Sequence, residues 1–236
     1  MIEGLPPYIS IVFLLTTLAT VWFFFSAARC RGGGTTGYRI LTFTVPFWLL
    51  LSGYLATTDF YRRENAVPPR IVVFAVLPAL VMIVSFFIFF RRFIADLSLR
   101  TLTLLHIVRV PVEIVLLWLY QEGQVPRDMT FEGWNFDILS GMTAPLVAWI
   151  AFRNGRVNRP LLTVWNLVAL GLLIIIVTIA VLSFRSPFQQ IGFDQPNVGV
   201  TYLPFIWLPA VVVPIVLFAH LAALYNSLRA QDGQNI

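Results

Sequence analysis

Residues 101–120 decide the fold, and they read TLTLLHIVRVPVEIVLLWLY. The stretch has the ~20 residues that an α-helix needs to cross a bilayer, and leucine, valine and isoleucine fill most of it. It also contains His106, Arg109 and Glu113, side chains that are rare inside membrane-spanning helices. The stretch therefore predicts a spanning helix with a polar site near its middle.

The whole chain has the composition of a membrane protein. Of its 236 residues 58% are hydrophobic and only 11% are charged, and the mean hydropathy is +0.83. A soluble domain carries about 25% charged residues, so this chain cannot build a water-facing surface. The composition excludes a soluble enzyme, a nucleic-acid-binding protein and a disordered chain. It predicts an all-α, polytopic integral membrane protein whose first partner is the lipid bilayer.

Six further stretches resemble residues 101–120 in length and apolar content. Together the seven predict a single seven-helix transmembrane domain over residues 1–236, with no soluble domain. The fifth is the shortest and contains Gly141, Thr143 and Pro145, so we expect it to be tilted, broken or partly re-entrant. The predicted spans are residues 6–28, 38–57, 71–90, 101–120, 136–152, 161–184 and 202–224.

The connections between these spans differ in charge. All 16 basic residues are arginines, because the chain has no lysine, and the net charge is +5. Connections 29–39, 91–100 and 153–159 and the C-terminal tail are rich in arginine, whereas the opposite connections hold most of the acids. The positive-inside rule then predicts an N-terminus outside and a C-terminus in the cytoplasm. We expect the bacterial inner (cytoplasmic) membrane.

Five polar residues share one face of the fourth span. At ~100° per residue they fall within an arc of roughly 120°, and they are Thr103, His106, Arg109, Glu113 and Tyr120. Arg109 lies ~13 Å from the cytoplasmic end of the helix, where an unpaired charge costs ~3 kcal/mol or more. Glu113, four residues further on, is the predicted partner of Arg109.

One carboxylate does not satisfy the five N–H donors of Arg109, so further acceptors or an anionic ligand are expected beside it. The carbonyl of Ile107, which Pro111 deprives of its helical donor, is one candidate. Two interpretations stay open. Arg109 and Glu113 form a structural ion pair between helices, or they form a functional site in which His106 relays protons.

Prolines occur inside several other predicted spans, at Pro46, Pro78, Pro145 and Pro214 among others. Each proline leaves the carbonyl four residues earlier without its helical donor. In lipid that carbonyl must find another partner on a neighbouring helix, a water or a ligand.

No cofactor or metal site is expected. A retinal Schiff base needs a lysine amine, and Cys30 is the only cysteine. A haem or metal site on His106 and His220 would need further ligands that the sequence does not supply. His220 is therefore interpreted as a packed or interfacial residue near the cytoplasmic end of the last helix. Asn166 is predicted to hydrogen-bond between helices.

The connection before the fifth span, residues 126–137, is dense in aromatic and acidic residues. Asn135 is suited to cap the following helix, and Asp137 suits the positive end of that helix. Glu132, Asn135 and Asp137 are candidates for an outer gate above the polar site. The alternative is an aromatic belt at the membrane surface with solvated acids.

Three functions remain open, and whether the chain is an enzyme is not decided. The first is a transporter or ligand-binding receptor for a small anionic molecule, with proton coupling through His106 and Glu113. The second is an intramembrane enzyme with a lipid-like substrate and His106 or Glu113 as its base. The third is a structural or assembly subunit with a purely structural ion pair. A filled core around Arg109, without an adjoining hollow, favours the third. The oligomeric state stays open.

Overall fold

The computed structural model describes residues 2–32, 34–62, 68–153 and 157–232, and these residues are organised as helices with connecting turns. Arg63, Glu64 and Arg156, which contributed to the charge asymmetry, and Gly33 lie outside the described residues. The long helices are α1 (Pro7–Gly32), α2 (Thr36–Thr57), α3 (Leu77–Phe89), α5 (Leu99–Leu105), α6 (Arg109–Gln121), α7 (Ile138–Ala151), α8 (Arg159–Leu182) and α9 (Val213–Asp232).

Short helical segments extend or join these helices. Two π-helices, η2 (Val72–Val76) and η7 (Leu208–Val212), precede α3 and α9 directly, and a 3₁₀ turn, η3 (His106–Val108), joins α5 to α6. The connections contain η1 (Phe60–Arg62), α4 (Arg91–Ala95), η4 (Arg127–Met129) and η6 (Gly199–Thr201).

Within the described part of the chain, six helical stretches are long and apolar enough to cross a membrane, so the chain has the architecture of a multi-pass membrane protein. They are Pro7–Arg29, Thr36–Thr57, Val72–Phe89, Leu99–Gln121, Arg159–Leu182 and Leu208–Arg229. The fifth predicted span corresponds to α7, whose 14 residues fall short of the ~20 that a crossing needs.

The predicted start of the last span, residue 202, is wrong. Residue 202 is a bend and residues 203–206 form turns, so the helix begins at Trp207, directly before η7. Pro204 explains the difference, because a proline lacks a backbone donor and disfavours helical conformation in the residue before it.

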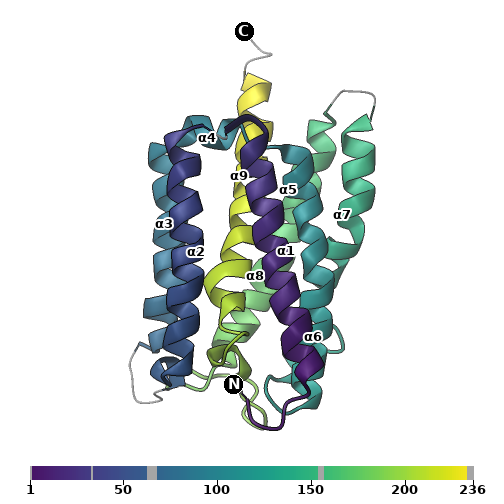
Figure 1. Ribbon diagram of the computed structural model, residues 1–236. Coiled ribbons are helices and arrows are strands. Elements are labelled where there is room, and N and C mark those ends of the chain that lie inside the picture. The colour runs from purple at the N-terminus through teal and green to yellow at the C-terminus, as the bar shows by residue number, and fades with distance from the viewer. Residues whose placement is uncertain (1, 33, 63–67, 154–156, 233–236) are drawn as a thin grey trace.

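Two spans form the centre of the bundle. In Leu99–Gln121 and in Leu208–Arg229, 61% of the residues in the most apolar stretch are buried, against 22–33% in the other four. Figure 1 shows α9 in the middle of the molecule, with α2 and α3 on one side and α5, α6 and α7 on the other. The polar residues of the fourth span are therefore inside protein.

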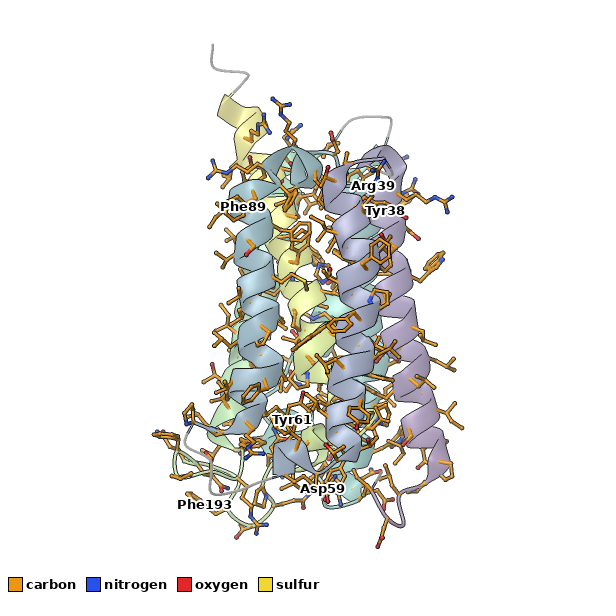
Figure 2. The ribbon with its side chains drawn as sticks, turned by 60° about the vertical axis from the view of Figure 1, so that its left-hand side comes forward. Tyr38, Arg39, Asp59, Tyr61, Phe89 and Phe193 are labelled. Atoms are coloured by element: carbon orange, nitrogen blue, oxygen red, sulfur yellow. The ribbon has the colours of Figure 1, made fainter. Side chains whose placement is uncertain are left out.

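The outer faces of the peripheral helices carry large apolar side chains (Figure 2). Phe43, Phe47 and Leu50 of α2 are 64–79% exposed, and Trp149 of α7 and Val164 of α8 are 60% and 61% exposed. Exposed apolar patches of this extent belong in a hydrocarbon environment.

Two backbone carbonyls that lack a helical donor because of a proline accept hydrogen bonds from side chains. The indole N–H of Trp48 in α2 donates to the Ala210 carbonyl at 3.0 Å. Pro214, four residues further along the helix, has no backbone N–H to donate to this carbonyl. The hydroxyl of Tyr61 donates to the Phe74 carbonyl at 3.4 Å, the one that Pro78 leaves free. Burial raises the pKa of Tyr61 to about 12, so this hydroxyl keeps its proton at physiological pH.

The two termini of the chain lie at opposite ends of the bundle (Figure 1). Figure 2 shows Arg39 and Phe89 at the C-terminal end, and Asp59, Tyr61 and Phe193 at the opposite end.

Candidate functional site

Arg109 lies at the centre of a buried polar cluster. It is the first residue of α6, and it is 3% exposed. Its Nε donates to Asp137 Oδ2 at 2.5 Å, and its Nη2 donates to the other carboxylate oxygen of Asp137. Such a two-point arginine–carboxylate contact is the strongest ion-pair geometry available to these side chains. Arg109 is therefore fixed to the residue that precedes α7.

The remaining donors of Arg109 contact two other helices. Nη2 also donates to the Ala169 carbonyl of α8 at 3.1 Å, and Nη1 contacts His220 Nε2 of α9 at 3.0 Å. All three guanidinium nitrogens thus contact protein atoms, and the contacts join α6 to α7, α8 and α9.

The predicted Arg109–Glu113 pair is wrong. Among the described residues Glu113, which is 1% exposed, makes no ion pair, and its Oε2 accepts a hydrogen bond from Asn135 Nδ2 at 2.6 Å. A spacing of four residues brings two side chains to one helix face, but it does not give the two parallel hydrogen bonds that Asp137 offers. The Ile107 carbonyl is likewise not the backbone acceptor of Arg109, because the Ala169 carbonyl has that role.

A tight turn before α7 brings Asp137 to Arg109. The Asn135 side-chain oxygen accepts from the Asp137 backbone N–H at 3.0 Å, and its Nδ2 also donates to the Met129 carbonyl at 2.9 Å. Asn135 thus uses all its hydrogen-bonding groups. Asn135 lies three residues before α7, whose N-cap is Asp137, so it does not cap the helix as predicted but joins Glu113 to the turn.

A close approach of α7 to the fourth span contributes to the same geometry. A Cβ atom added to Gly141 would lie 2.8 Å from Val110 Cγ2 and 2.9 Å from the Val110 backbone nitrogen. Only glycine fits at this distance, which holds the first turn of α7 against η3 and α6. Small residues allow such close backbone contacts between membrane helices.

His220 connects Arg109 to α8. A guanidinium N–H can only donate, so His220 Nε2 accepts and the ring proton lies on Nδ1. Nδ1 then donates to Asn166 Oδ1 at 2.8 Å, and Asn166 Nδ2 donates to the Leu162 carbonyl at 2.8 Å. The prediction that Asn166 bonds between helices is confirmed. His220 is packed as expected, but it is completely buried rather than interfacial.

His106 lies beside this network without joining its hydrogen bonds. Its ring stacks on that of His220, with centroids 4.0 Å apart and planes at 25°, and it meets Trp165 edge-on at 5.3 Å. His106 is 1% exposed, and its Nδ1 has no hydrogen-bond partner within the described residues. The environment of His106 is thus aromatic.

Thr103, Tyr120 and Glu132 form no hydrogen bond with Arg109. Thr103 is buried, but its hydroxyl donates to Leu99 of its own helix at 2.9 Å. Tyr120 is half-buried, and its carbonyl accepts from Gln195 at 2.7 Å. Glu132 is exposed, whereas Asn135 and Asp137 are buried. Of the three residues predicted as an outer gate, the two buried ones belong to the core cluster.

His106, Arg109 and Glu113 line none of three cavities that lie among the described residues. A space of about 30 Å³ lies between apolar residues of α1, α2, α3 and α9. A hollow of about 640 Å³ opens at the C-terminal end, and one of about 160 Å³ lies at the other end. Within the described part of the chain, no group of three His, Cys, Asp or Glu side chains is placed to hold a metal ion.

Comparison with known proteins gives one match. No curated protein and no solved structure matches the chain. A family model described as a domain of unknown function, DUF8737, matches residues 67–228. The matched region begins before η2 and ends within α9, and it contains Arg109, Asp137 and His220. The chain belongs to the DUF8737 family.

Proposed function

We propose that the chain forms one seven-helix membrane domain, with α7 as the fifth of seven crossings. Two observations support an odd number of crossings. The termini lie at opposite ends of the bundle (Figure 1), and α7 runs beside α8 in the same picture. At ~1.5 Å per residue the 14 residues of α7 cover only about 21 Å, so this crossing needs help from the buried turn at Asn135.

The same proposal puts the N-terminus outside and the C-terminus in the cytoplasm. The arginine-rich connections and tail lie at the C-terminal end, and such loops stay in the cytoplasm. The assignment to the bacterial inner membrane remains a prediction from the sequence.

We infer that the polar cluster is a structural lock, and that the chain serves as a structural or assembly subunit of the membrane. One observation carries this inference: all three guanidinium nitrogens of Arg109 already contact protein atoms. Removing one partner of a buried ion pair costs ~3–5 kcal/mol. A cluster that spans four helices therefore fixes their relative positions strongly.

The geometry gives less support to Arg109 as an anchor for an anionic ligand. Asp137 occupies the two-point carboxylate position on the guanidinium, and the cavities described above lie elsewhere. A ligand that binds Arg109 must first displace Asp137.

A second candidate is the proton-coupled transporter or receptor for a small anionic molecule. The observation that favours it is the buried His106 Nδ1 without a hydrogen-bond partner, because orphaned buried polar atoms call for an explanation. In this version the ligand competes with Asp137 for Arg109, and the stacked His106 and His220 rings carry the proton. The enzyme hypothesis has less support, because no carboxylate within the described residues is hydrogen-bonded to His106.

A binding measurement distinguishes the two candidates. Purified protein in detergent is titrated with acetate, lactate and inorganic phosphate by calorimetry, next to the double variant Arg109→Leu/Asp137→Leu. If the cluster is a structural lock, any binding of these anions is the same in the native chain and in the double variant. Saturable binding of any of these anions that disappears in a folded double variant would overturn the structural proposal in favour of the second candidate.

A further inference from the structure

The largest of these three cavities lies at the arginine-rich end of the bundle. Its volume of about 640 Å³ falls within the ~300–1,000 Å³ that is typical of small-molecule sites. Its wall comes from the turn between α4 and α5, the end of α7, the start of α8 and the last turns of α9. Three arginines line it, namely Arg100, Arg159 and Arg229.

These arginines have guanidinium groups available to a ligand. Arg100 and Arg229 are exposed, and Arg159 is held by a single hydrogen bond from its Nη1 to the Asn226 carbonyl at 2.9 Å. Within the described residues none of the three makes an ion pair. This contrasts with Arg109, whose nitrogens are all used by the protein.

The charge around the hollow is unbalanced. Among the described residues that line it, Asp96 is the only acid, against three arginines. Hydrogen bonds fix the wall of the hollow. Asn226 Nδ2 donates to the Ile94 carbonyl at 2.9 Å, and the Ser98 hydroxyl accepts from the Thr101 backbone N–H. A rigid basic hollow between helices suits an anion with several oxygens.

We propose that this hollow, named here the basic hollow, binds the phosphate group of an anionic lipid headgroup. Basic pockets between membrane helices on the cytoplasmic side bind such headgroups, and each arginine near the surface contributes about 1 kcal/mol. The apolar Phe152 and Val157 in its wall suit the glycerol and upper acyl region of the same lipid. The proposal does not depend on the role of Arg109.

Native mass spectrometry of the full chain in detergent tests the proposal, with phosphatidylglycerol and phosphatidylcholine as probes. The variant Arg100→Gln/Arg159→Gln/Arg229→Gln is expected to bind phosphatidylglycerol about a hundredfold more weakly, at about fivefold per arginine. Phosphatidylcholine binding is expected to be weak in both proteins. Circular dichroism checks that the variant is folded.

The matched control is Arg39→Gln/Arg91→Gln/Arg92→Gln. These arginines are exposed at the same end of the bundle and do not line the basic hollow, and Figure 2 shows Arg39 at that end. The control removes the same charge and should lower affinity less than fivefold. Equal losses in the two triple variants, or no loss in either, would overturn the proposal.

A competition arm separates the two sources of phosphate. Inorganic phosphate at 10-fold excess over phosphatidylglycerol is expected to leave the lipid bound. Displacement at that ratio would assign the basic hollow to free phosphate and overturn the lipid proposal.

Discussion

The two sides of the bundle are held together by different chemistry. On one side α6, α7, α8 and α9 meet at the Arg109 cluster, where charged and amide groups bond to one another. On the other side α2 and α3 pack on α9 through aromatic and aliphatic contacts, such as Phe86 with Phe218 at 6.4 Å between ring centroids. We call these the polar side and the apolar side.

The apolar side still uses hydrogen bonds, and two of those between α2 and the last span come from indole groups. Trp48 donates to Ala210, and Trp207 donates to the Leu49 carbonyl at 2.9 Å. Lipid tails are as apolar as leucine, so membrane helices gain little by burying apolar surface against each other. Each side therefore also uses polar contacts. On the apolar side each hydrogen bond contributes little to stability, whereas on the polar side the hydrogen bonds are concentrated around Arg109.

This difference predicts which substitutions destabilise the protein most. A lost contact on the apolar side leaves one carbonyl without a partner. A lost partner on the polar side leaves a buried charge, which costs several times more.

The largest effect is expected from Arg109→Leu. This variant leaves the Asp137 carboxylate unpaired in the core, so we expect a loss of ~3–5 kcal/mol in stability. Thermal unfolding in detergent measures it, with the lipid-facing Leu146→Ala (Leu146 is 56% exposed) as the control. If Arg109→Leu lowered the melting temperature no more than Leu146→Ala does, the polar side would not be more sensitive than the apolar side.

A smaller effect is expected from Gly141→Ala. The new Cβ would meet Val110 at 2.8 Å, so α7 must move away from α6, at ~1–3 kcal/mol. The matched variant is Gly171→Ala, because a Cβ at Gly171 meets no atom within 4 Å. Equal melting temperatures for the two variants would show that the close approach of α7 is unimportant.

Asn166→Leu sharpens the comparison within the polar side. It leaves the His220 Nδ1–H without its acceptor, and a buried unsatisfied donor costs ~1–3 kcal/mol. We expect a loss near the lower end, about 1 kcal/mol, because the Arg109–Asp137 pair remains. Chemical unfolding of the purified protein measures it, and a loss equal to that of Arg109→Leu would mean that His220 and not Asp137 is the main partner of Arg109.

The smallest effect is expected on the apolar side, from Trp48→Phe. It removes the indole N–H from the Ala210 carbonyl but keeps an aromatic ring, and hydrogen bonds between membrane helices average ~0.6 kcal/mol. The same unfolding assay measures it. A loss above about 3 kcal/mol would show that the apolar side is as sensitive as the polar side.

Sequence patterns predicted the environment of Arg109 better than its partners. A charge halfway along an apolar helix must be buried in protein and must be paired, and Arg109 is both. The partner was wrongly predicted because helix periodicity indicates Glu113, whereas Asp137 reaches Arg109 through a turn that Asn135 holds and through the close approach of α7 at Gly141. No periodicity in the sequence indicates where that turn ends.

The same limit applies to His220 and to the last span. His220 was interpreted as packed or interfacial. Its complete burial and its contact with Arg109, which joins residues 111 positions apart, depend on tertiary packing. The late start of the last span follows from Pro204, a signal that was present in the sequence and that hydropathy alone outweighed. Most span positions were predicted well, because a run of apolar residues needs no tertiary information.

The coupling free energy between Arg109 and Asp137 tests the account most directly. Stability is measured for the native chain, Arg109→Leu, Asp137→Leu and the double variant in one detergent. If the cluster is a structural lock, each single variant loses ~3–5 kcal/mol, and the double variant recovers about 3 kcal/mol of the summed loss. A double variant whose loss equals the sum of the two single losses would contradict the account.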